Sequence, residues 1–204
     1  HRDLHSFPTR RSSDLGIFFE KEASEGKTGS AGWYNTAAFE AAADAAGLWN
    51  KHLNGDAFTD EMKSQAISLI RAEMGKIDLV VYSLAAPRRK DPVTGEVYSS
   101  VLKPIQQAYT AKTLNTSKRE IENVSVEPAN DEEIFNTVKV MGGEDWERWL
   151  DQLHAAGVLA DNVQTVAYTY IGKELTWPIY GKATIGRAKE DLDQIGRASC
   201  RERV

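Results

Sequence analysis

The stretch Ile77-Asp-Leu-Val-Val-Tyr-Ser-Leu84 is an almost unbroken apolar run. Such a run is typical of a strand that is buried on both faces of a parallel sheet. Two strand-and-helix pairs precede it, with strands expected over 16–20 and 48–55 and helices over 33–46 and 59–74. This alternation predicts a doubly wound parallel α/β sheet, in which functional groups gather where the strands end.

The pattern loosens after this strand. Pro92-Val-Thr-Gly95 and the apolar residues around it predict a β-hairpin insertion, and residues 116–128 predict another short strand. The insertion suits a lid over a substrate and a scaffold loop equally well. Helices over 131–140 and 144–156 and a strand over 163–171 complete the expected elements.

Both ends of the chain look foreign to this pattern. Residues 1–15 and 195–204 resemble translated sequencing-adaptor DNA, although a basic arm and a basic tail are also compatible with their composition. We therefore expect both ends to be disordered. The folded domain then spans residues 16–194, as a fragment truncated at both ends.

Charge excludes several kinds of partner. The chain has 25 Lys and Arg against 30 Asp and Glu, of which six and three lie in the two ends, so residues 16–194 carry a net charge of −8. An acidic domain does not offer the basic face that nucleic acid requires, and we expect neither nucleic-acid binding nor binding to an anionic membrane.

The remaining composition excludes further classes. Cys200, the one cysteine, lies in the tail, so residues 16–194 have no disulfide framework and no thiolate chemistry. No apolar stretch approaches the roughly 18 residues of a membrane span. His52 and His154 have no neighbours at metal-ligand spacing, so no metal site is expected.

Tyr180 and Lys189, separated by eight residues, form the most informative pair. A phenol can deliver a proton to an oxygen that becomes negative during hydride transfer, and a nearby ammonium favours the phenolate. One continuous helix would put the two side chains on opposite faces. An irregular stretch is therefore expected after Tyr180, where Gly181 and Gly186 permit one. A tyrosine at the core edge and a solvated lysine are the alternative.

Polar features also follow the expected strands. Glu20, Asp56 and the segment 83–86 come after the first, second and third strand. An acid at such a strand end can accept hydrogen bonds from the ribose hydroxyls of a dinucleotide. For Glu20 alone, a solvated strand-end acid is the competing interpretation.

These segments together resemble a known family. The sequences Gly16-Ile-Phe-Phe-Glu-Lys21, Asn54-Gly-Asp-Ala-Phe58, Val140-Met-Gly-Gly-Glu-Asp-Trp146 and the spacing of Tyr180 and Lys189 are similar to the FabV-type enoyl-[acyl-carrier-protein] reductases, also described as trans-2-enoyl-CoA reductases. The gap between tyrosine and lysine is longer than in ordinary short-chain dehydrogenases. It therefore separates this family from its neighbours.

The resemblance implies a Rossmann-like fold of the short-chain dehydrogenase/reductase type in a cytoplasmic, monomeric bacterial enzyme. Its reaction would be the NADH-dependent reduction of the C2–C3 double bond of an enoyl-acyl carrier protein or enoyl-CoA in fatty acid synthesis. It also implies that Tyr180 is catalytic, that Lys189 assists it and contacts the cofactor, and that Tyr170 lines the substrate site.

The resemblance further implies that Glu20 favours NADH, because its carboxylate would repel a 2′-phosphate. Glu190 stands where the family has a second lysine, which puts an auxiliary role in doubt. The implied cofactor-binding residues are Phe19, Glu20, Asp56, Ala57, Ser83, Leu84, Ala85 and Lys189.

Three expectations remain open at this point. The glycine-rich phosphate turn would precede Gly16, so we expect the 204-residue chain alone to bind NADH poorly and to be inactive. A short-chain-type ketoreductase would use the same polar pair on a saturated carbonyl. A nucleotide-sensing module, in which Tyr180 is structural, is the alternative without catalysis.

Overall fold

Two pairs of parallel strands carry the fold of this computed structural model, which describes residues 13–169 and 174–202. The chain divides into two units at Lys76 and Ile77, with one strand pair in each. In the first unit β1 pairs with β2, and in the second β3 pairs with β8. The elements of the first unit are β1 (Ser13–Phe18), α1 (Ala31–Ala45), β2 (Trp49–Asn54), α2 (Asp60–Leu69) and the π-helical turn Ile70–Met74.

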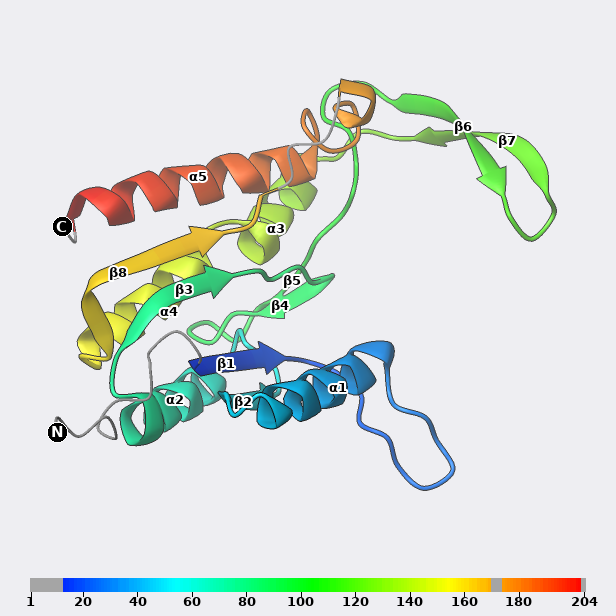
Figure 1. Cartoon of the computed structure of the whole chain (residues 1–204). Helices are drawn as coiled ribbons and strands as arrows, with labels where there is room; N and C mark the ends of the chain where they lie inside the picture. Colours follow the sequence, from blue (N-terminus) through cyan, green and yellow to red (C-terminus); the bar gives the residue numbers. More distant parts are fainter. Residues whose placement is uncertain (1–12, 170–173, 203–204) are drawn as a thin grey trace, which may run out of the picture. The chain divides into compact units, whose positions relative to one another are not determined.

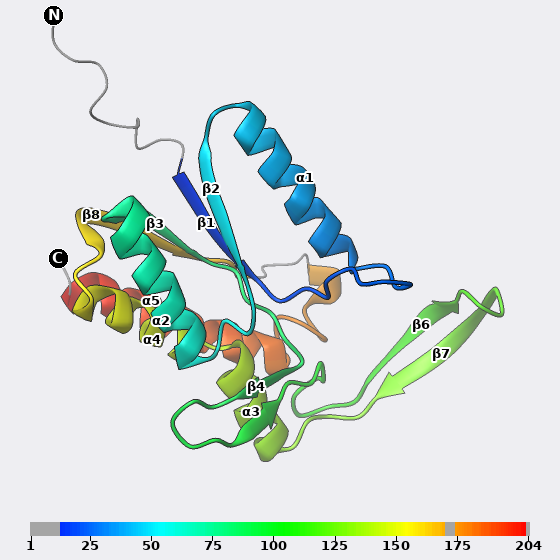
Figure 2. The same cartoon turned by 90° about the horizontal axis from the view of Figure 1, so that it is seen from below.

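In the first unit α1 connects the two strands and packs along β2 (Figure 2). The Oγ1 of Thr59 accepts the Met62 N–H and caps α2. Lys63 is fully buried on α2, and its ammonium donates to the carbonyl oxygens of Ala57 and Phe58 at 3.0 and 3.1 Å. These hydrogen bonds satisfy a buried charge and hold the loop after β2 against the helix.

The second unit adds two hairpins and three longer helices to the β3–β8 pair (Figure 1). Asn130 and Glu133 form a capping box that begins α3. Its elements are β3 (Ile77–Tyr82), β4 (Arg88–Lys90), β5 (Val97–Ser99), β6 (Tyr109–Asn115), β7 (Glu120–Val126), α3 (Asp131–Met141), α4 (Glu144–Ala155), β8 (Leu159–Ala167), the 3₁₀ turn Glu174–Thr176 and α5 (Thr184–Glu202).

Helix α5 packs on α3 and on α4, and α4 packs on β8. The indole Nε1 of Trp146 donates to Thr165 Oγ1 at 2.9 Å and ties α4 to this strand. The apolar residues that form this core are Val140, Trp146, Trp149, Leu150, Leu153, Val158, Ala188 and Leu192.

The expected α/β order with parallel strand pairing is confirmed within each unit. In the second unit the partner of β3 is β8, far along the chain. The last strand spans Leu159–Ala167, whereas the expected range was 163–171. Its ladder with β3 stops at Tyr82 and Ala167, where β3 itself ends.

The hairpin at Pro92–Gly95 is confirmed as β4–β5, with its turn between Lys90 and Val97. The strand expected within 116–128 is β7, and its partner β6 was missed. β6 reads Tyr-Thr-Ala-Lys-Thr-Leu-Asn, which is too polar to stand out as a buried strand. The insertion therefore contains two hairpins.

Both expected ends of the domain are wrong as boundaries of regular structure. β1 begins at Ser13, because Ser13, Asp14 and Leu15 pair with β2 in register. Helix α5 continues to Glu202, and the side chain of Ile195 lies against Gly143. The expected disorder of residues 1–12 and 203–204 falls outside the described residues, and the adaptor origin of both ends stays a prediction.

Candidate active site

Lys189 on α5 reaches the carboxyl ends of β3 and β8. Its ammonium donates to the carbonyl oxygen of Tyr168 at 3.4 Å, and the Tyr168 N–H donates to the carbonyl oxygen of Tyr82 at 3.0 Å. Tyr82 is the last residue of β3, and Tyr168 follows the last residue of β8. The lysine therefore lies at the edge where parallel sheets of this kind bind ligands.

The segment Ser83, Leu84 and Ala85 leaves β3 at the same edge. It has no regular structure, and Ser83 and Ala85 are exposed while Leu84 is half-buried. Because Ser83 follows Tyr82 directly, the structure places this segment and Lys189 at one edge of the second unit.

Tyr180 is half-buried in a turn that precedes α5. Its N–H donates to the carbonyl oxygen of Thr176 at 2.9 Å, and the Lys182 N–H donates to that of Trp177 at 2.7 Å. The helix begins only at Thr184, so the irregular stretch expected after Tyr180 is confirmed.

The start of α5 is fixed by Thr184, which is fully buried. Its Oγ1 donates to the carbonyl oxygen of Val101 and accepts the Lys103 N–H at 3.3 Å, and its own N–H donates to the Lys103 carbonyl oxygen at 3.0 Å. These bonds tie the helix that carries Lys189 to the segment after β5.

Glu20 in the first unit lies against the first turn of α1. Its carboxylate accepts a hydrogen bond from Ser30 Oγ, and a side chain at Gly32 would overlap its Oε1. The Glu20 N–H and carbonyl oxygen also bond to the amide of Asn54 at 2.9 Å each. The carboxylate is therefore held in one orientation near a helix N-terminus, which favours negative charge.

Asp56 and Ala57 follow β2, as expected. The Asp56 Oδ1 accepts the Phe58 N–H at 3.0 Å, which makes a tight turn before α2. Ala57 is buried, and its carbonyl oxygen accepts from Lys63. Phe19, beside Glu20 in the chain, is 78% exposed, so its ring is accessible to a ligand.

Tyr170 lies outside the described residues. The strand that was expected over 163–171 ends at Ala167 in the structure. The predicted place of Tyr170 and its role at the substrate stay predictions.

Burial changes the titration of two groups at the β3–β8 edge. Partial burial lowers the pKa of Lys189, and the carboxylate of Asp193 partly offsets this shift. Burial also raises the pKa of Tyr82 far above its ordinary range. The Tyr82 hydroxyl donates a hydrogen bond to Asp145 Oδ2 at 3.2 Å, and the charge of this carboxylate adds to the upward shift of the pKa. Tyr82 therefore stays neutral.

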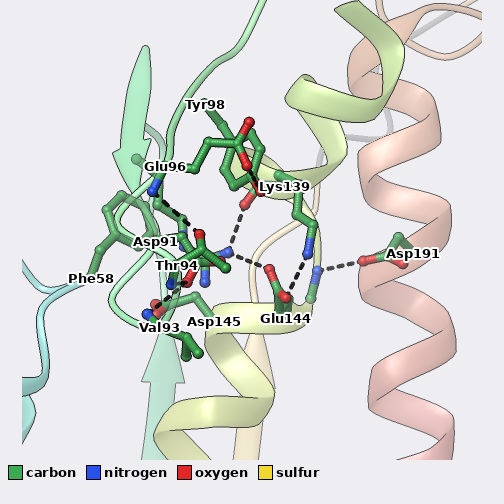
Figure 3. A network of polar contacts seen from close by, with 12 residues as sticks. Phe58, Asp91, Val93, Thr94, Glu96, Tyr98, Lys139, Glu144, Asp145 and Asp191 are labelled. Atoms are coloured by element: carbon green, nitrogen blue, oxygen red, sulfur yellow. Dashed lines mark hydrogen bonds and ion pairs between the residues drawn. The ribbon is translucent and has the colours of Figure 1, made fainter. Parts of the chain in front are cut away.

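A polar network around the buried Arg89 was missed from the sequence (Figure 3). Glu144 pairs with Lys139 and with Arg89, each at 2.8 Å, and Arg89 also donates to the Lys139 carbonyl oxygen at 2.7 Å. Arg89 lies 50 positions before Lys139 and 55 before Glu144, and a sequence pattern does not connect positions so far apart. The network fastens β4 to α3 and α4.

A cavity of about 570 Å³ lies beside the start of α5 in the second unit. Its walls come from residues 104–109, from Pro178, from 181–183 and from Arg187 and Glu190. Lys189 is not among these lining residues, although its neighbour Glu190 is.

The described ranges contain no group of three His, Cys, Asp or Glu that could hold a metal ion. None of the helices in those ranges has both the length and the apolar content needed to cross a membrane.

Residues 27–201 match the family model of the trans-2-enoyl-CoA reductase catalytic region. The chain belongs to this family.

A curated relative from Pseudoalteromonas translucida, named enoyl-[acyl-carrier-protein] reductase [NADH], is 70% identical over 184 residues, which is 90% of this chain and 46% of the relative. The Treponema denticola trans-2-enoyl-CoA reductase, crystallised in complex with NAD, is 49% identical with a TM-score of 0.88, covering 92% of this chain and 47% of its own. The Clostridium acetobutulicum trans-2-enoyl-CoA reductase, in complex with NADH, is 43% identical with a TM-score of 0.85. The match covers 93% of this chain and 48% of the Clostridium chain.

The chain thus spans about half the length of the relatives it matches. The range matched by the trans-2-enoyl-CoA reductase model contains Asp56, the segment after β3, Tyr180 and Lys189, while Glu20 lies before its first residue.

Proposed function

We propose that the whole protein carrying this chain reduces the C2–C3 double bond of trans-2-enoyl thioesters with NADH. The observation that carries the proposal is the placement of Lys189 at the carboxyl edge of β3 and β8, with Tyr180 in the turn that leads into the same helix. Membership of the trans-2-enoyl-CoA reductase family supports it.

Each unit contributes its own group of candidate cofactor residues. In the first unit, the Glu20 carboxylate is held in place by Ser30 and Gly32 and would accept from the adenosine ribose, with Asp56 and Ala57 near the adenine. In the second unit, Lys189 and residues 83–85 would contact the nicotinamide half. Among the described residues the Lys189 ammonium has the Tyr168 carbonyl as its acceptor, and an ammonium has three N–H donors.

NADH, when bound, supplies a hydride to the β-carbon of the enoyl thioester. The thioester oxygen then gains negative charge as an enolate. Tyr180 would donate its hydroxyl proton to that oxygen, and Lys189 would stabilise the developing charge through its ammonium. Tyr170 would line the substrate site beside the thioester.

The finer features of the fold are part of the same proposal. We assign the two parallel strand pairs to a Rossmann-like sheet of the short-chain dehydrogenase/reductase type, supported by the likeness to the two solved reductases. The cytoplasmic location, the monomeric state and the absence of nucleic-acid binding stay predictions.

The test uses a whole protein, because the relatives are about twice as long as this chain. In a chimeric protein, the 184 aligned residues of this chain replace the matching residues of the P. translucida relative. We expect it to oxidise NADH with crotonyl-CoA and not with a β-ketoacyl thioester. Turnover of the β-ketoacyl substrate alone would establish a ketoreductase, and turnover of neither would leave a nucleotide-sensing module.

The chain by itself is the matched control for the chimeric protein. We expect it to bind NADH weakly and to give no turnover with crotonyl-CoA. Turnover by the isolated chain comparable to that of the chimeric protein would contradict this part of the proposal.

A further inference from the structure

Gly186 is the third residue of α5, and backbone atoms of the preceding turn occupy the space that a side chain at this position would need. A Cβ atom added to it would overlap the carbonyl oxygen of Gly181 and would lie 2.7 Å from the Gly181 carbonyl carbon and 2.9 Å from the Tyr180 carbonyl oxygen. The peptide that follows Tyr180 therefore lies directly on the bare backbone of α5.

This contact determines which face of α5 the Tyr180 turn occupies. Gly186 and Lys189 are three positions apart on the helix, and residues at that spacing are neighbours on one face. The turn consequently packs on the face that carries Lys189. A continuous helix would have put Tyr180 and Lys189 on opposite faces.

Neither side of the contact can easily give way. The turn is held by hydrogen bonds to the carbonyl oxygens of Thr176 and Trp177, and the start of α5 is fixed by the buried Thr184. The atoms that a methyl group would meet belong to the backbone, which cannot change rotamer as a flexible side chain does. A side chain at Gly186 must therefore move the Tyr180 turn away from the helix.

We infer that Gly186 is a positioning residue, whose missing side chain sets the separation between the Tyr180 hydroxyl and the Lys189 ammonium. This inference rests on the proposed function, since it assigns both side chains to one reaction. Gly186 itself touches neither substrate nor cofactor.

The experiment is Gly186→Ala in the chimeric protein. A misplacement of about 1 Å can lower a rate by about 10²-fold, so we expect kcat with crotonyl-CoA to fall by about 10- to 100-fold. We expect the dissociation constant of NADH and the KM of crotonyl-CoA to stay within about threefold, because the displaced group acts mainly in the transition state. The solvent deuterium isotope effect on kcat should rise, since proton delivery becomes slower.

Gly142→Ala is the control for general damage to α5. A Cβ there would lie 2.5 Å from the carboxylate of Asp191 and 2.5 Å from the carbonyl oxygen of Val138. It therefore presses on α3 and also on α5, but beyond Lys189. We expect this variant to lose thermal stability and to keep the solvent isotope effect and, well below its Tm, the kcat of the parent.

Gly181→Ala decides the matter if Gly186→Ala fails to fold. Its Cβ would meet the Trp177 ring at 3.3 Å and would shift the same turn slightly, so a smaller loss of kcat with retained NADH binding supports the inference. Parent-like kcat in the folded Gly186→Ala, or in Gly181→Ala if it alone folds, would overturn it, as would an equal kcat loss in Gly142→Ala. A parent chimeric protein without enoyl-thioester reduction would instead refute the proposed function.

Discussion

The Lys189 ammonium bonds to the carbonyl oxygen of Tyr168, which is itself hydrogen-bonded through its N–H to Tyr82. One helix thereby presents a cation at the end of both parallel strands of the second unit. The variants of Lys189, Tyr180 and Glu20 and their controls are made in the chimeric protein.

Lys189→Met should lower kcat on the order of 10²-fold and weaken NADH binding, because it removes a donor for developing charge at the strand ends. Glu190→Gln is the matched control on the next residue. Glu190 pairs with Arg187 at 2.9 Å, both side chains are more than half exposed, and such a pair contributes little. Steady-state kinetics of both variants check this, and equal losses would show that the charge of α5 as a whole matters.

The same Lys189→Met variant should melt at a higher temperature than the parent at pH 7. Burial lowers the pKa of Lys189, so the protonated side chain destabilises the folded state. This cost is full below the lowered pKa and is relieved as pH rises toward the ordinary value of 10.5. The gain in Tm should therefore shrink as pH approaches that value. Melting curves from pH 7 upward measure it, with the exposed Lys112→Met as control, and a gain that grows with pH would contradict the assignment.

Tyr180→Phe should lower kcat by roughly 10²- to 10⁴-fold, the range for losing a positioned proton donor. The ring still packs in its turn, so the Tm should change little. Single-turnover and steady-state kinetics with crotonyl-CoA decide it. A variant within a few-fold of the parent would move the proton-transfer role to another residue, with Tyr170 tested first.

Glu20→Ala should relax the preference for NADH over NADPH, because it removes a carboxylate that would repel a 2′-phosphate. Ser30→Ala should do the same to a smaller extent, since Ser30 Oγ holds that carboxylate in place. The ratio of kcat/KM for the two cofactors is the measurement. An unchanged ratio in Glu20→Ala would show that the acid is a solvated strand-end residue.

Thr184→Val should lower the free energy of unfolding by about 1–3 kcal/mol, the cost of leaving buried polar partners unpaired. The variant keeps the volume of threonine and loses the hydroxyl that joins Val101 and Lys103. Thr184→Ser, which keeps the hydroxyl, should retain most of the stability. Chemical denaturation of the two variants compares them, and a larger loss in the serine variant would assign the effect to the methyl group.

The sequence predicted the local elements because their signals are local. The apolar run at Ile77 and the hairpin turn at Pro92–Gly95 each act over a few residues, and the structure confirms a strand and a hairpin there. The burial expected on both faces of that strand is not confirmed, because Leu79 and Val81 are about half exposed. The break after Tyr180 was predictable in the same way, from two glycines and a helix period.

The features that were not predicted from the sequence depend on contacts between distant residues. The partner of β3 is β8, and the partner of Tyr82 is Asp145, 63 positions later. A single sequence does not show such pairings, so the partner of β3 and the polar network around Arg89 were not foreseen. For the same reason, the face of α5 on which the Tyr180 turn packs became known only from the structure.

The pairing of β3 with β8 also constrains how a ribosome can make this protein. Strand β3 leaves the ribosome long before β8, and the bond from Thr184 to Val101 joins positions 83 apart. Contacts so distant in sequence form slowly. During translation, the nascent chain therefore exposes an apolar strand with an open edge until both hairpins and two helices have been synthesised, and such an edge promotes aggregation. A chaperone that covers β3 during this interval would protect the later assembly of the edge that carries Lys189.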